Sequence, residues 1–124
     1  MMHRRVLIID DEESIQLVVQ FGLKLSAGWD VLVASSGLEG IRQAASEQPD
    51  MILLDVMMPE MDGLTTFREL QNNGETRSIP VILLTAKAQA SEKRLFNDTG
   101  VQGVITKPFN SLELAEQIIK VLDW

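Results

Sequence analysis

Short apolar runs alternate with longer amphipathic segments along the whole chain of 124 residues. The apolar runs have the length of buried strands, and the longer segments repeat apolar residues at the spacing of one helix face. The predicted strands span Arg5–Asp10, Trp29–Ser35, Met51–Asp55, Ile79–Ala86 and Gly103–Thr106. The predicted helices span Glu12–Ser26, Gly37–Glu47, Gly63–Asn73, Ala90–Gly100 and Asn110–Leu122.

This alternation predicts an α/β domain in which a five-stranded parallel sheet is flanked by five helices. The strands are apolar throughout, which is typical of strands that are buried on both faces. The commonest arrangement is the flavodoxin-like doubly wound sheet with strand order 2-1-3-4-5. Its switch point lies between the first and third strands, and ligands bind at the carboxyl ends of the strands.

Composition narrows the possible functions. The net charge of −7 argues against binding to DNA or anionic membranes and suits a protein that holds cations or meets basic surfaces. The chain has no cysteine, which excludes disulfides and thiolate chemistry, and only one histidine. No apolar run approaches the roughly 20 residues of a membrane span, and the start does not resemble a signal peptide. We therefore expect a cytoplasmic protein that binds neither nucleic acid nor membrane.

The polar residues at the predicted strand ends all fall on one edge of the sheet. They are Asp10, Asp11, Asp55, Thr85, Thr106 and Lys107. Two carboxylates about 5 Å apart repel by roughly 3 kcal/mol at an effective dielectric of about 20. Raised pKa values, the lysine or a divalent cation would relieve this repulsion. Oxygen ligands select Mg²⁺, Mn²⁺ or Ca²⁺, and a site with few protein ligands suits Mg²⁺.

With a cation present, one aspartate can attack a phosphoryl group. Asp55 is the best candidate because its strand lies centrally, while Lys107 and Thr85 have the positive charge and the hydroxyl that the transferring group needs. Each residue also has a simpler interpretation. The acidic run after the first strand could cap a helix, Thr85 could be an N-cap, and Lys107 could be a solvated surface residue. These interpretations do not explain why all of them fall on one edge.

Four segments carry a resemblance that covers essentially the whole chain. They are "VLIIDDEESI", "PDMILLDVMMPEMDGL", "IPVILLTA" and "GVITKPF". In this order, and at these strand ends, they resemble the receiver domain of two-component response regulators, close to the chemotaxis regulators. The resemblance implies a single receiver domain over residues 1–124, without an output domain in this chain. It also implies that the protein is not an enzyme, apart from catalysing its own phosphorylation and dephosphorylation.

The resemblance assigns a role to each residue of the edge. Asp55 would accept a phosphoryl group from a histidine kinase or a histidine phosphotransfer protein. Asp11, Asp55 and the main-chain carbonyl of Met57 would ligate Mg²⁺, and Asp10 would hold a metal-bound water. Lys107 would pair with the phosphoryl oxygens and would precede a cis peptide bond to proline. Thr85 would report the phosphoryl group to a surface formed by the fourth helix, the fifth strand and the last helix, where an unidentified downstream protein binds.

Val104 departs from the family, which usually has an aromatic residue at this position. A valine fills less of the gap than a ring that moves inward with the threonine. We therefore expect a smaller conformational change, or one carried by main-chain shifts around Thr85–Lys87 and the fourth helix. Lys87 is expected near the mouth of the site, where it would affect dephosphorylation together with Met57.

The first helix carries a second feature of interest. Its core-facing side is predicted to consist of Ile15, Val18, Val19, Gly22 and Leu25. Leu17 and Phe21 lie beside that side and are either partly covered by a neighbouring helix or exposed. Exposed, they would form a docking patch for a kinase or phosphotransfer helix, or the contact of a weak homodimer.

Three other functions fit the chain less well. A haloacid-dehalogenase-type phosphohydrolase needs an Asp-x-Asp motif after the first strand, where this chain has Asp10-Asp11-Glu12. A flavin- or nucleotide-binding module needs a glycine- or hydroxyl-rich phosphate loop there, and the acidic run would repel phosphate. A receiver that signals without phosphate would not need the complete acidic site.

Overall fold

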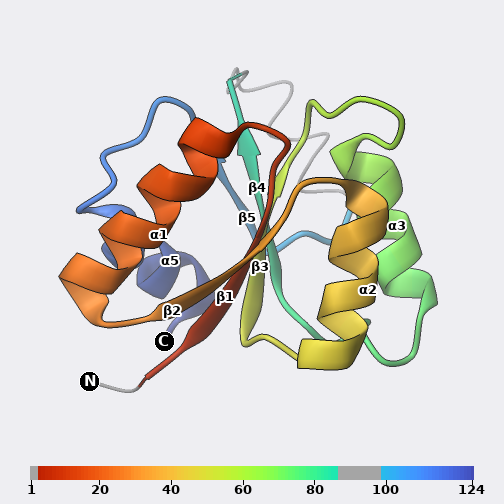
Figure 1. The fold of residues 1–124 in the computed structure, drawn as a ribbon. Coiled ribbons are helices and arrows are strands. Elements are labelled where there is room, and N and C mark those ends of the chain that lie inside the picture. Colours follow the sequence, from red (N-terminus) through yellow and green to blue (C-terminus); the bar gives the residue numbers. More distant parts are fainter. Residues whose placement is uncertain (1–2, 87–98) are drawn as a thin grey trace.

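A computed structural model describes residues 3–86 and 99–124 (Figure 1). Its five parallel strands have the predicted order β2-β1-β3-β4-β5. The strands are β1 (Arg5–Ile9), β2 (Asp30–Ala34), β3 (Met51–Asp55), β4 (Val81–Thr85) and β5 (Gly103–Thr106). The helices of the described part are α1 (Glu13–Ala27), α2 (Gly37–Glu47), α3 (Gly63–Asn72) and α5 (Leu114–Leu122). The helix predicted over Ala90–Gly100 lies outside the described residues, apart from its last two.

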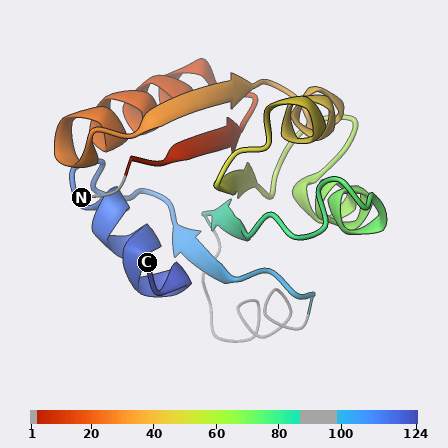
Figure 2. The same ribbon diagram turned by 90° about the horizontal axis from the view of Figure 1, so that it is seen from below.

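The sheet is covered on both faces, with α1 and α5 on one side and α2 and α3 on the other (Figures 1 and 2). Successive side chains of β1 point to opposite faces. Val6 and Ile8 pack into the core beneath α1 and α5, whereas Leu7 and Ile9 pack into the core beneath α2 and α3. All four are fully buried. The uninterrupted apolar runs of the sequence therefore arise from burial on both sides.

The start of the last helix differs from the prediction, whereas the boundaries of the other described elements agree within two residues. Helix α5 begins at Leu114 rather than at Asn110. The Asn110 side chain accepts a hydrogen bond of 2.9 Å from the backbone N–H of Leu112. A local turn of this kind competes with the helix for the same backbone groups, which delays its first turn.

The predicted inward face of α1 is wrong at two positions. Val18 and Leu25 are 41% and 75% exposed. Gln16 and Leu23 are buried instead, on the same side as Val19. Apolar residues occur around most of this helix, so their spacing alone does not identify the stripe that meets the sheet.

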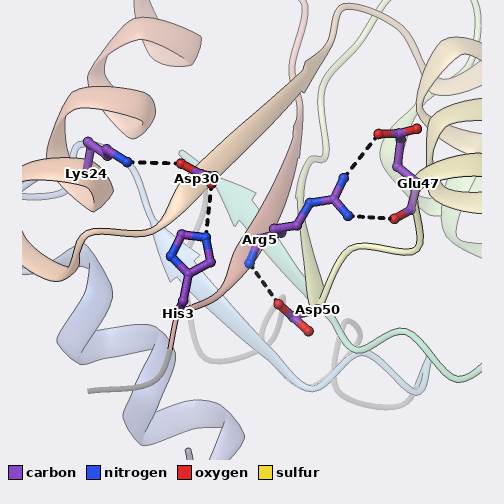
Figure 3. A network of polar contacts seen from close by, with 6 residues as sticks. All are labelled: His3, Arg5, Lys24, Asp30, Glu47 and Asp50. Carbon is purple, nitrogen blue, oxygen red and sulfur yellow. Dashed lines mark hydrogen bonds and ion pairs between the residues drawn. The ribbon is translucent and has the colours of Figure 1, made fainter.

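Polar contacts surround the amino ends of β2, β1 and β3 (Figure 3). They involve His3, Arg5, Lys24, Asp30, Glu47 and Asp50. The Arg5 guanidinium donates to the Glu47 side chain and to its backbone oxygen, each at 3.1 Å. The Arg5 backbone N–H donates to Asp50 at 2.7 Å, which ties β1 to the residue before β3. Exposed ion pairs of this kind contribute little stability.

No helix of the described residues is both long enough and apolar enough to cross a membrane.

Candidate functional site

Three aspartates meet at the carboxyl ends of β1 and β3. Asp10 and Asp11 follow β1, and Asp55 is the last residue of β3. The two strands pair directly, so the residues that follow them arrive at the same edge of the sheet. One carboxylate oxygen from each aspartate lies within 4.8 Å of the others. The predicted acidic cluster is confirmed.

The three carboxylates differ in their access to water. Asp10 is fully buried and Asp55 is 3% exposed, whereas Asp11 is exposed. An Asp10 oxygen accepts a hydrogen bond of 2.9 Å from the backbone N–H of Glu12. An Asp55 oxygen accepts a longer one, of 3.4 Å, from the backbone N–H of Met57. The backbone therefore fixes the two buried carboxylates, and Asp11 opens the cluster to solvent.

Lys107 brings a positive charge to this cluster. Its ammonium lies 3.1 Å from an Asp10 oxygen and 3.2 Å from an Asp55 oxygen, and its side chain is 15% exposed. The Lys107 backbone N–H donates a hydrogen bond of 2.8 Å to the carbonyl of Thr85. Pairing between β4 and β5 thus continues past the strand ends and delivers the lysine to the acidic residues.

The charges of the site are only partly balanced. Burial raises the pKa of the Asp55 carboxyl, the Asp10 carboxylate raises it further, and Lys107 opposes both effects. Burial alone would lower the pKa of Lys107, but its hydrogen bond to Asp10 and the charges of Asp10 and Asp55 raise it. Three carboxylates and one ammonium leave an excess of negative charge. An open group of oxygen donors with this charge suits a hard divalent cation such as Mg²⁺.

Thr85 and Gly63 also lie next to this edge. Thr85 is the last residue of β4 and is 2% exposed. Gly63 begins α3, where a Cβ atom would collide with the carbonyl oxygen of Asp55 and with the Cα of Val56. Glycine therefore lets α3 start directly against the strand that carries Asp55. The predicted role of Lys87 concerns a residue outside the described part of the chain.

Gln16 also belongs to this region, although the sequence patterns do not single it out. Its side-chain amide donates a hydrogen bond of 2.6 Å to the main-chain carbonyl of Asp10. Gln16 lies three residues before the core residue Val19 and therefore on the same face of the helix. A polar residue on a core-facing side is the sequence feature that could have indicated a buried hydrogen bond.

Residues 6–119 match the family described as response regulator receiver domain. The chain belongs to this family, and it is therefore a receiver domain of a two-component response regulator. The cis peptide bond between Lys107 and Pro108, which the resemblance implied, is present.

Two relatives are similar over nearly the whole of this chain. The alkaline phosphatase synthesis transcriptional regulatory protein PhoP of Bacillus subtilis is 37% identical over 121 residues, which are 98% of this chain and 49% of that protein. The DNA-binding dual master transcriptional regulator RpaA of Synechocystis is 39% identical over 118 residues, which are 95% of this chain and 48% of that protein. The chain thus spans about half of the length of these relatives.

Solved structures agree with the fold. The chemotaxis response regulator CheY4 of Vibrio cholerae superposes with a TM-score of 0.88 at 29% identity, covering 97% of this chain and 99% of that one. A response regulator of Desulfuromonas acetoxidans gives a TM-score of 0.85 at 29% identity, covering 97% of both chains. The predicted flavodoxin-like fold and the predicted similarity to chemotaxis regulators are confirmed.

Proposed function

We propose that this receiver domain is a phosphoacceptor and that Asp55 is the residue that becomes phosphorylated. The observation that carries the proposal is the Lys107 ammonium, which lies between the buried carboxylates of Asp10 and Asp55. A lysine held in this way is ready to meet the oxygens of a phosphoryl group on Asp55. Asp11, which is exposed, leaves the cluster open toward an incoming donor.

The donor is a phosphohistidine on a histidine kinase or on a histidine phosphotransfer protein. An Asp55 carboxylate oxygen attacks the phosphorus, and a P–O bond forms while the P–N bond breaks. The leaving imidazole nitrogen keeps the electron pair of that bond and takes up a proton. Lys107 offsets the negative charge on the phosphoryl oxygens, and the Thr85 hydroxyl donates a hydrogen bond to one of them.

Mg²⁺ is the cofactor of this proposal. The residues that would hold it are Asp10, Asp11 and Asp55 together with the main-chain carbonyl of Met57, with Asp10 acting through a water. Their oxygens and their excess of negative charge fit the ion. When bound, the ion supplies positive charge that neutralises the phosphoryl oxygens. Without it, the acidic edge would repel a phosphoryl donor.

The state of Asp55 is passed on through a surface made of the helix predicted over Ala90–Gly100, β5 and α5. In the described part, a groove between β5 and α5 is lined by residues that include Val104, Phe109, Gln117 and Val121. An unidentified downstream protein binds this surface. The two relatives, which are named as transcriptional regulators, are about twice as long as this chain.

The phosphoryl donor meets the exposed apolar side of α1. Leu17 and Phe21 are 46% and 65% exposed, so both side chains are accessible to a partner. Apolar residues one helical turn apart form anchors for a partner helix. A weak homodimer through the same patch is the competing use of this surface.

Intact mass after incubation with acetyl phosphate and Mg²⁺ tests the proposal. Wild type should gain one phosphoryl group only when Mg²⁺ is present, and Asp55→Asn should gain none. Asp50→Asn, which changes a carboxylate at the opposite end of β3, should behave as wild type. A wild type that gains no phosphoryl group either from acetyl phosphate or from a histidine kinase would refute the proposed function.

A further inference from the structure

Gln16 is a buried polar residue that touches the acidic edge without contributing a charge to it. It is the fourth residue of α1, and only 8% of its surface is exposed. Its side-chain amide nitrogen donates two hydrogen bonds, one of 2.6 Å to the main-chain oxygen of Asp10 and one of 3.1 Å to the Ser35 hydroxyl. Both hydrogens of the amide group are thereby used.

These two hydrogen bonds join the loops that follow β1 and β2. Asp10 comes directly after β1, and Ser35 comes directly after β2. The Ser35 backbone N–H donates in turn to the Glu39 carboxylate on α2, at 3.2 Å. The amide of Gln16 is therefore anchored on a second loop, and its position does not depend on the acidic loop alone.

Every polar group of Asp10 makes a hydrogen bond. Its carboxylate accepts from the Glu12 backbone N–H and from Lys107, and its own N–H donates to the carbonyl of Ala34 at 3.0 Å. Gln16 holds the remaining polar group, the main-chain carbonyl. That carbonyl belongs to the peptide group that leads into Asp11. The direction in which the exposed Asp11 carboxylate points therefore depends on this peptide plane.

We propose that Gln16 is a positioning residue for the metal site. By fixing the peptide group between Asp10 and Asp11, its amide makes the two carboxylates converge with Asp55 on one divalent cation. The inference rests on the proposed function, because it takes Mg²⁺ as the ion. Hydrogen bonds that orient ligands from behind are known to control metal affinity in proteins.

The test is a titration of the full chain with Mg²⁺ alone, followed by the NMR shifts of backbone amides and without any phosphoryl donor. Gln16→Met keeps the length of the side chain and removes both donors. Its Mg²⁺ dissociation constant should rise about tenfold relative to wild type. Gln20→Met makes the same change one turn further along α1, away from the acidic edge, and should leave the constant unchanged. Because the titration is done on folded protein, a mere loss of global stability would not alter it.

Two more variants make the test sharper. Ser35→Ala removes only the anchor of the amide and should weaken Mg²⁺ binding by a smaller factor than Gln16→Met does. Gln16→Glu replaces the donor by an acceptor and adds a negative charge that by itself would attract a cation. Weaker binding in Gln16→Glu would therefore identify the loss of the amide's hydrogen bonds, and not a change of charge, as the cause. This variant also tests the proposal if Gln16→Met does not fold.

The possible outcomes separate the two proposals. Wild-type affinity in folded Gln16→Met, or tighter binding in Gln16→Glu, would overturn the role of Gln16 and leave the proposed function intact. If wild type binds no Mg²⁺, or if Asp55→Asn binds it as well as wild type does, the proposed metal site fails and the role of Gln16 fails with it.

Discussion

Lys107 joins the two buried carboxylates of the site, since its ammonium lies 3.1 Å from Asp10 and 3.2 Å from Asp55. The three residues come from the ends of three different strands, β1, β3 and β5. Removing the ammonium would leave two carboxylates facing each other with little water to screen them. The lysine is therefore expected to stabilise the folded domain as well as to assist its chemistry.

We expect Lys107→Met to lower the free energy of unfolding of the metal-free protein by about 3 kcal/mol, because breaking a buried ion pair leaves an uncompensated charge. Urea unfolding measures this change. Mg²⁺ at ten times its dissociation constant should return about 1.4 kcal/mol to either protein. Lys120→Met, on the exposed side of α5, is the control. Equal stability of Lys107→Met and wild type would show that the ion pairs contribute nothing.

The raised pKa of Asp55 predicts a pH dependence of stability. Burial, and then the charge of Asp10, make the folded protein bind this proton more readily than the unfolded chain does. Stability therefore falls as the pH rises from the ordinary value of 3.8 through the raised pKa. Between about pH 7 and about pH 4, metal-free wild type should gain stability relative to Asp55→Asn as the pH is lowered. A constant difference between their urea midpoints would contradict this.

The lowered pKa of Asp62 predicts a pH dependence of stability that is opposite to that of Asp55. Asp62 caps the amino end of α3, where its carboxylate accepts a hydrogen bond of 2.8 Å from the backbone N–H of Thr65, and this bond lowers the pKa of Asp62. Asp62→Ala should lower the free energy of unfolding by about 1 kcal/mol near neutral pH. Because the pKa is lowered, the contribution is present above 3.8 and disappears as the pH falls through the lowered value. Glu69→Ala, at an exposed position of α3, should show neither effect.

If α1 docks the phosphoryl donor, loss of its exposed apolar side should slow phosphorylation by a protein donor but not by a small molecule. Replacing both Leu17 and Phe21 by serine should slow phosphotransfer from a cognate histidine kinase by about tenfold or more, since apolar anchors dominate such contacts. Phosphorylation by acetyl phosphate should keep its wild-type rate, because this donor needs no docking surface. Leu38→Ser is a matched control, since Leu38 is 52% exposed on α2. A kinase that reacts equally well with the double variant would disprove the docking role.

Because Val104 stands where the family usually has an aromatic residue, we expect a smaller conformational change on phosphorylation. Val104 is partly buried on β5, pairs with Leu83 of β4 and packs against the core beneath α2 and α3. With no ring to move inward, the change on phosphorylation should be carried by main-chain shifts around residues 85–87. Structures of the free and the beryllofluoride-bound protein would reveal it. A ring-sized rearrangement of another side chain on this face would refute the expectation.

Much of the site could be predicted because the topology of a parallel sheet collects its strand ends. Once the strands before Asp11, Asp55 and Lys107 are recognised, their carboxyl ends share one edge whatever the side chains do. The clustering of the aspartates followed from this rule, and the structure confirms it. The contacts of the Lys107 ammonium with both Asp10 and Asp55 did not follow, because a flexible side chain reaches several neighbours from one backbone position.

The alternating apolar pattern by itself determined the order of elements, the two-sided burial of the strands and the edge that carries the chemistry. Only the tertiary structure decided which stripe of α1 faces the sheet, because Val18 and Leu25 are as apolar as the buried Leu23. It also decided that Gln16 turns its amide toward Asp10. Local sequence constrains backbone periodicity, whereas the choice among equally apolar faces, and among partners for a buried polar group, depends on residues distant in the chain.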